Sequence, residues 1–222
     1  MKNMQIILVV SAIVIAIVSF WFYCKPIKST GTVIILNGPS AAGKSSIQKE
    51  FQHLMMPNLW LKLGIDNLFD QPMPDITLEN ISFWQTENPI RWVDTSKDSA
   101  DNAIITLFTG EQGDKVAYAM NSAIAAYAHN GCNIIVDYIA YKKEWIEDLQ
   151  CKLKDIKTCW VKVAIPLDRL EERETARATS PKGHARSHYD TVYWNLPYNL
   201  EVNSDTNSAH AIAQQIKHFL NL

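Results

Sequence analysis

Residues 38–45 read GPSAAGKS and fit the pattern G-x-x-x-x-G-K-[ST] at every fixed position. An apolar run precedes this octet at residues 32–37, and an amphipathic stretch follows at residues 44–56. The glycines let the backbone curl so that successive N–H groups point inward, and the start of a helix adds its positive dipole end. The octet therefore predicts a phosphate-binding loop between a buried strand and a helix. The alternative is an incidental Gly-rich turn, which would need neither a strand before it nor a helix after it.

The loop residues are expected to bind Mg²⁺ and a nucleoside triphosphate, with ATP as the phosphoryl donor. Lys44 would bridge the β- and γ-phosphates, and the Ser45 hydroxyl would bind Mg²⁺. The full predicted nucleotide-binding set is Gly38, Pro39, Ser40, Ala41, Ala42, Gly43, Lys44, Ser45 and Ser46.

Two aspartates close apolar runs. Asp137 ends the run 133–137, where a buried carboxylate needs a cation or hydrogen bonds, so it is a candidate for the metal site. Asp66 follows the run 60–65, at the strand edge where ligands bind in open α/β sheets, and is a candidate general base for an attacking hydroxyl. Two alternatives stay open: Asp137 caps the next helix or faces solvent, and Asp66 caps a short helix through Asp70.

Arg169, Arg173 and Arg177 share one face of a predicted helix that begins after Pro166. Such a helix could act as a lid, at about residues 167–190, that brings catalytic arginines onto the transferring phosphoryl group. Arg186 could join them. The alternative is a solvated face neutralised by Glu172 and Glu174.

Short apolar runs alternate with amphipathic stretches over most of the chain, which predicts strands alternating with helices. The predicted strands are 32–37, 60–65, 133–137, 158–165 and 200–203, and the predicted helices are 44–56, 114–129, 142–154, 167–178 and 208–220. This order favours a five-stranded parallel sheet covered on both faces, a three-layer α/β fold. Two long segments, 67–110 and 178–199, break the alternation, which is typical of segments that bind a ligand or move.

Some side chains carry weaker signals. Phe83, Trp84 and Trp92 could form a wall for an acceptor or a small satellite core. We assign structural or surface roles to His129, His184, His188 and His210. The four cysteines form no Cys-x-x-Cys pair, so neither a metal site nor a disulfide framework is indicated. A net charge of −2 gives no reason to expect a nucleic-acid partner.

Residues 6–24 run without a charged side chain and approach the ~20 apolar residues that cross a bilayer as a helix. The run ends in aromatic residues, which suits an uncleaved anchor better than a signal peptide. We therefore expect residues 1–30 to be a single-pass membrane anchor with its linker and residues 31–222 to be one catalytic domain. Because ATP is cytosolic, that domain is expected to face the cytosol.

Several segments together resemble the chloramphenicol phosphotransferase family of P-loop kinases over nearly all of residues 32–222. They are VIILNGPSAAGKSSI, LGIDNLFDQPMP, IIVDY, LEERETARATSPKGHAR and YNLEVNS. The resemblance implies ATP-dependent phosphorylation of a small-molecule hydroxyl, as in chloramphenicol 3-O-phosphorylation and antibiotic resistance. It also implies that Asp66 is the general base, that Lys44 and Ser45 are the phosphate-loop residues, and that Arg173 and Arg177 are lid arginines.

Departures from the family pattern put the acceptor in doubt. Asn199 and Asn203 replace two acids near the carboxyl end, Tyr193 stands where His is frequent, and the segment 67–110 diverges. An acceptor that is a nucleotide, sugar or nucleotide-sugar is the alternative within the enzymes. From another class, the alternative is a nucleotide-binding switch protein tethered to a membrane.

Overall fold

The five predicted strands form one parallel sheet in the computed structural model, which describes residues 29–98, 101–177 and 180–222. Within these residues the order is β2-β5-β1-β6-β7. The strands are β1 (Val33–Asn37), β2 (Trp60–Gly64), β5 (Asn133–Tyr138), β6 (Thr158–Ala164) and β7 (Leu200–Asn203). The prediction of an α/β fold with a five-stranded parallel sheet is confirmed.

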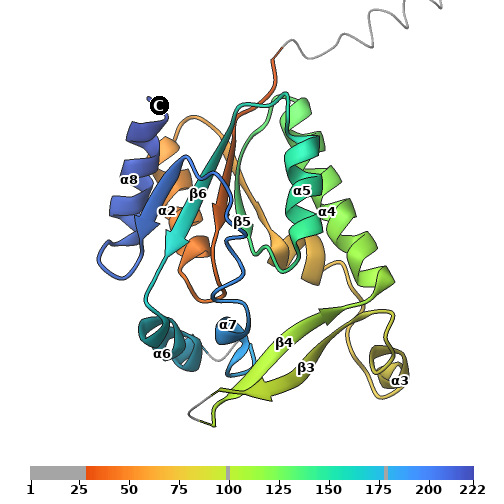
Figure 1. Ribbon diagram of the computed structural model, residues 1–222. Coiled ribbons are helices and arrows are strands. Elements are labelled where there is room, and N and C mark those ends of the chain that lie inside the picture. Colours follow the sequence, from red (N-terminus) through yellow and green to blue (C-terminus); the bar gives the residue numbers. More distant parts are fainter. Residues whose placement is uncertain (1–28, 99–100, 178–179) are drawn as a thin grey trace, which may run out of the picture.

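Helices cover both faces of the sheet, which makes three layers (Figure 1). One face packs on α2 (Lys44–Met55) and α8 (Ala209–Phe219), and the other packs on α4 (Glu111–His129) and α5 (Lys143–Lys152). Successive residues of β1 serve the two faces in turn: Val33 and Ile35 belong to one buried cluster, and Ile34 and Leu36 to the other. β1 is buried on both sides, as its unbroken apolar run requires.

The carboxyl ends of the central strands are held in register. Leu36 and Gly64 are both paired with Asp137, so three neighbouring strands end at one level. Beyond this edge lie the short π-helix η1 (Asp66–Asp70), the helix α6 (Leu167–Arg177) and the single turn α7 (His184–Ser187). Ligand-binding side chains that follow these strands therefore converge on one place.

The first long segment contains more regular structure than the sequence indicated. Residues 67–110 include the short helix α3 (Ile81–Trp84) and an antiparallel hairpin of β3 (Ile90–Lys97) and β4 (Ala103–Thr109). The hairpin is separate from the main sheet and lies below it in Figure 1, beside α7. The break in the alternation of strands and helices at 67–110 is therefore filled by a short helix and a separate hairpin.

The predicted membrane helix at residues 6–24 lies outside the described residues and stays a prediction. In the part of the chain that the structure describes, no helix is both apolar enough and long enough to cross a bilayer.

Candidate active site

The phosphate-binding loop turns tightly between β1 and α2. Gly43 has φ of 88°, a left-handed conformation that glycine adopts without strain, and Ala41 also has a positive φ, of 61°. Gly38 packs against β6, where an added Cβ would lie 2.6 Å from the Val163 carbonyl oxygen. The close approach of β6 therefore explains the first glycine of the motif, and the left-handed turn explains the second.

Lys44, Ser45 and Asp137 meet at the base of this loop. The Lys44 ammonium group donates to the Pro39 carbonyl oxygen at 2.8 Å and lies 3.3 Å from Asp137 Oδ1. The Ser45 hydroxyl donates to Asp137 Oδ2 at 2.6 Å. Burial lowers the pKa of Lys44, and the nearby Asp137 carboxylate opposes that shift. Asp137 neither caps a helix nor faces solvent, so both alternative interpretations of it are wrong.

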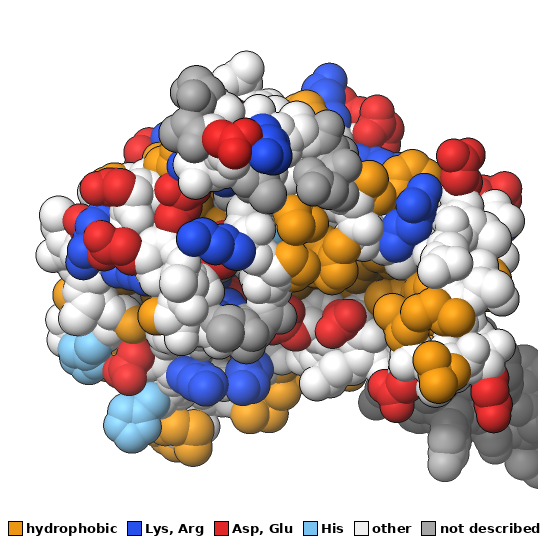
Figure 2. All heavy atoms as spheres, turned by 90° about the horizontal axis from the view of Figure 1, so that it is seen from below, with side chains coloured by type: hydrophobic (Ala, Val, Ile, Leu, Met, Phe, Trp, Pro, Cys, Tyr) orange, Lys and Arg blue, Asp and Glu red, His pale blue; other side chains and the backbone are white. Residues whose placement is uncertain are grey.

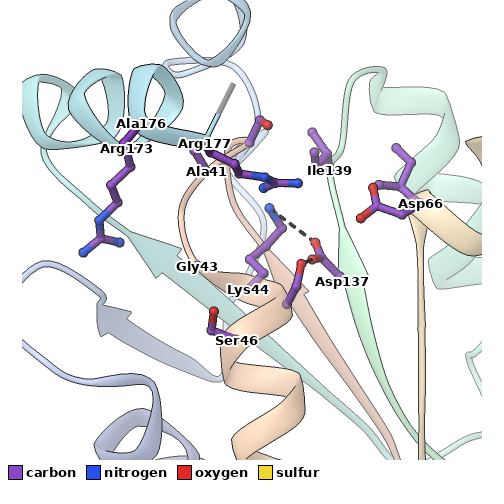
Figure 3. A pocket seen from close by; sticks show the side chains of 13 residues that line it. Ala41, Gly43, Lys44, Ser46, Asp66, Asp137, Ile139, Arg173, Ala176 and Arg177 are labelled. Atoms are coloured by element: carbon purple, nitrogen blue, oxygen red, sulfur yellow. Dashed lines mark hydrogen bonds and ion pairs between the residues drawn. The ribbon is translucent and has the colours of Figure 1, made fainter. Parts of the chain in front are cut away.

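The site fits a magnesium–triphosphate complex. A cavity of about 680 Å³ lies over the loop and is lined by Ser40, Ala41, Gly43, Lys44, Ser45, Ser46, Asp66, Asp137, Arg173 and Arg177, among others (Figure 3). A hydroxyl and a carboxylate that already contact each other are the oxygen ligands that Mg²⁺ prefers. Lys44 and the open amide groups of the loop suit phosphate oxygens.

Asp66 lines the same cavity from η1, shortly after the end of β2. It is the first residue of η1 and is solvent-exposed. Ile65 occupies the N-cap position of η1 and makes no side-chain cap hydrogen bond, so the alternative that Asp66 is a cap is wrong. Asn67 accepts the Gly64 N–H at 2.8 Å. Partial desolvation, then the nearby Asp137 carboxylate, raises the pKa of Asp66, and Arg177 and Lys44 oppose the shift. The geometry leaves Asp66 free to accept a proton from a ligand.

The predicted lid arginines have different surroundings. Arg177 extends toward Lys44 and Asp137, whereas Arg173 points to one side (Figure 3). Arg173 donates to the Ser204 carbonyl oxygen at 2.7 Å, and an added Cβ on Gly43 would lie 3.6 Å from its guanidinium. Both line the cavity, so the structure brings both to the site.

Arg169 and Arg186 lie outside the cavity. Arg169 pairs with Glu172 and Asp205, so the expectation of a solvated ionic face holds for this one arginine. Arg186 pairs with Glu171 in α6 and with Asp98, directly after β3. These two ion pairs link α6 to the hairpin.

Glu174 does not follow the alternative in which it neutralises an arginine. Its buried carboxylate accepts the backbone N–H groups of Gly183 and Ala185 at 2.8 and 2.7 Å. It therefore fixes α7 against α6.

A second cavity, of about 860 Å³, continues from the first on the far side of Asp66. It is lined by η1, the hairpin and α7, and its apolar side chains include Phe69, Met73, Trp84, Ile90, Trp92, Leu107 and Tyr141. Figure 2 shows the hollow from below, with hydrophobic side chains around it and acidic side chains beside it. Of the two alternatives left open for these aromatic residues, Trp84 and Trp92 line a cavity, while Phe83 packs against Trp84 with 5.5 Å between ring centroids.

Two histidines in the second long segment are part of the site, which the sequence analysis missed. His184 and His188 are buried, their rings lie 4.7 Å apart, and Tyr141 bonds to His184 Nε2 at 3.0 Å. His188 Nε2 accepts the backbone N–H of Ser40 at 3.1 Å. Their separation of four residues, one helical turn, is the signal that could have pointed to them.

The buried histidines predict that acid destabilises the protein. Burial lowers the pKa of His184 from 6.5 to about 4 and the pKa of His188 well below 6.5. Below about pH 6.5 the unfolded chain therefore binds more protons, so the free energy of unfolding falls as pH drops. His184 alone should contribute roughly 3 kcal/mol between pH 6.5 and 4, on the usual value per pKa unit.

Urea unfolding over this pH range measures the effect. His184→Gln should lose less stability on acidification than the wild type, whereas His129→Gln, at an exposed position at the end of α4, should match the wild type. An identical pH dependence in His184→Gln and the wild type would contradict the prediction.

The fold and this arrangement of Lys44, Ser45 and Asp137 define a P-loop enzyme of the phosphotransferase class. The sequence model of the family described as chloramphenicol phosphotransferase-like protein matches residues 31–221. The chain therefore belongs to that family. In two strains of Mycobacterium tuberculosis, a protein named "Putative O-phosphotransferase" is 28% identical over 190 residues, which are 84% of this chain and 80% of the relative.

Solved structures of similar fold include kinases and a resistance protein. An APS kinase of Mycobacterium tuberculosis, in complex with AMPPNP and APS, has a TM-score of 0.56 and 18% identity over 87% of this chain and 99% of its own. The Deinococcus radiodurans tunicamycin resistance protein has a TM-score of 0.53 and 15% identity over 86% and 96%. Shikimate kinase from Acinetobacter baumannii, in complex with shikimate, has a TM-score of 0.52 and 11% identity over 87% and 95%. At such identities the likeness concerns the fold alone.

Proposed function

We propose that the protein transfers the γ-phosphoryl group of ATP to a hydroxyl of a small molecule. One observation carries the proposal: the cavity over the phosphate loop and the second cavity share Ser40, Ile65, Asp66, Ile139 and Arg177. A donor in the first and an acceptor in the second would therefore meet at Asp66. The volume of the second cavity, about 860 Å³, is within the range of small-molecule sites.

Each side chain has a role in the proposed reaction. Asp66 accepts the proton of the acceptor hydroxyl while that oxygen forms a bond to the γ-phosphorus and the bond to the β,γ-bridging oxygen breaks, which releases ADP. Lys44, Arg173 and Arg177 would stabilise charge on the phosphoryl oxygens, and Arg177 extends toward Lys44 and Asp137 (Figure 3). Ser45 and Asp137 would hold Mg²⁺, which would supply charge neutralisation on the triphosphate.

A labelled-product experiment tests the proposal. The purified protein is incubated with Mg²⁺, γ-labelled ATP and single hydroxyl compounds, including chloramphenicol, sugars, nucleotides and nucleotide-sugars, and products are identified by mass spectrometry. We expect label on one acceptor and none with a Lys44→Met variant. ATP hydrolysis without any phosphorylated acceptor, together with a protein partner captured only in the ATP state, would instead favour the nucleotide-binding switch.

A further inference from the structure

A hydrogen bond joins the lid segment directly to the phosphate-binding loop. The donor is the backbone N–H of Ser40, and the acceptor is Nε2 of His188, at 3.1 Å. The two residues are 148 positions apart in the chain. His188 is only 4% exposed, and Ser40 lines both cavities. A side chain that is not part of the loop therefore fixes a loop amide.

The hydrogen-bond network sets the tautomer of His188. Ser187 Oγ donates to the His184 carbonyl oxygen at 2.7 Å and lies 3.3 Å from His188 Nδ1. With its own hydrogen used, that hydroxyl accepts from Nδ1–H, which leaves Nε2 unprotonated to accept from Ser40. The charged and titratable groups that face the ring are His184, Tyr141 and Lys44. Burial, then His184 and Lys44, lowers the pKa of His188, so the ring is neutral at physiological pH.

The loop needs external support at this point. Ala41 follows Ser40 and has φ of 61°, a left-handed conformation that costs a residue with a Cβ of the order of 1 kcal/mol. Such strain persists only where the surroundings determine the backbone. Ala41 lies between two fixed amides, because Ser40 N–H bonds to His188 and Ala42 N–H bonds to the Pro39 carbonyl oxygen at 3.3 Å.

The histidine itself is held firmly. Glu174 accepts the N–H groups of Gly183 and Ala185, which anchors α7 to the lid helix α6. The ring of His188 packs against Tyr141 with 5.1 Å between ring centroids. The Val192 N–H donates to the His188 carbonyl oxygen at 2.9 Å. His188 can therefore impose a position on Ser40 instead of following it.

We propose that His188 is a positioning residue of the phosphate-binding loop: its Nε2 holds the Ser40 amide and thereby sets the backbone of Ser40 and Ala41 before nucleotide binds. The effect on nucleotide affinity rests on the proposed function, whereas the effect on the loop itself does not. The two can therefore fail separately.

Amide hydrogen exchange of the full chain without nucleotide tests the positioning directly. In His188→Ala the Ser40 amide loses its acceptor, so its exchange should be at least about tenfold faster than in the wild type, because an unmade buried hydrogen bond has consequences of this size. His188→Gln offers an amide oxygen that can accept from Ser40 and should restore slow exchange. His129→Gln is the matched histidine control.

Calorimetry with Mg²⁺ and a non-hydrolysable ATP analogue, and steady-state kinetics, complete the test. His188→Ala should raise Kd and KM for nucleotide about tenfold with a smaller change in kcat, and His188→Gln should stay within about threefold of the wild type. If His188→Ala fails to fold, Ser40 amide exchange and nucleotide binding are compared between His188→Gln and the wild type. Fast exchange with weak binding in His188→Gln contradicts the proposal.

Three results bear on the proposal in different ways. Unchanged Ser40 exchange in a folded His188→Ala would overturn it, and so would His188→Gln with fast exchange and weak binding. Faster Ser40 exchange in His188→Ala, together with a wild type that binds no nucleotide, would support the positioning role and reject the proposed function.

Discussion

Replacing Asp66 with asparagine is expected to lower phosphoryl transfer about a hundredfold or more while nucleotide binding stays almost unchanged, given the usual size of general-base effects. The substitution keeps the size of the side chain and removes only its ability to take a proton. Asp66 is exposed and makes no contact that holds the fold, so stability should be retained. Single-turnover rates and calorimetry with the nucleotide analogue measure the two effects separately.

The pH dependence of transfer provides a second readout for Asp66. Its pKa is raised by partial desolvation and then by Asp137, so the ionised base is lost as pH falls through that raised value. The wild-type rate should therefore decline on the acid side, and the decline should disappear in Asp66→Asn. Asp155→Asn, the same change at an exposed aspartate that lines neither cavity, is the matched control and should keep kcat within a few-fold of the wild type. Turnover near the wild-type rate in Asp66→Asn would exclude the general-base role.

The main sheet could be predicted because its central strands, β1 and β5, are buried on both faces. Such strands appear as short unbroken apolar runs, as in the fully buried β1 (Val33–Asn37), and the phosphate-loop motif fixes which helix follows which strand. Asp66 and Asp137 could be selected as site candidates for the same reason: each polar residue ends an apolar run, and parallel strands end at one edge.

The hairpin could not be recognised because its signal is local and weak. Its two strands face a cavity and α7 instead of a continuous core, so apolar and polar residues do not alternate strictly in Ile90–Lys97. The prolines at 72, 74 and 89 also favoured an irregular segment. Pairing between β3 and β4 is a tertiary result that propensity does not encode.

Side-chain partners far apart in sequence were also beyond prediction. Arg173 and Arg177 are four positions apart on one helix face. That spacing cannot reveal that Arg173 contacts Ser204 while Arg177 extends toward Lys44 and Asp137. The sequence around His188 also cannot reveal its contact with Ser40. That contact depends on how α7 packs against α6 and β4.

Replacing Lys44 with methionine is expected to weaken nucleotide binding and to lower kcat about a hundredfold or more, the size seen when one charge-stabilising donor is removed. The reason is that Lys44 is buried at the base of the loop, where its ammonium group lies 3.3 Å from Asp137 and would face a bound triphosphate. Lys49→Met, on the exposed side of the same helix α2, should bind and turn over like the wild type. Calorimetry and initial rates measure both effects.

Loss of stability and loss of chemistry must be separated in this variant. Without Lys44, the carboxylate of Asp137 stays buried, and among the described residues its remaining side-chain partner is the Ser45 hydroxyl. Breaking a buried ion pair costs about 3–5 kcal/mol. Lys44→Met combined with Asp137→Asn removes the unpaired charge, so urea unfolding should show stability recovered. Transfer should stay absent in the double variant, since both the ammonium group and the metal-binding carboxylate are gone. Recovery of activity together with stability would mean that Lys44 serves the fold alone and would remove the central support for phosphoryl transfer at this loop.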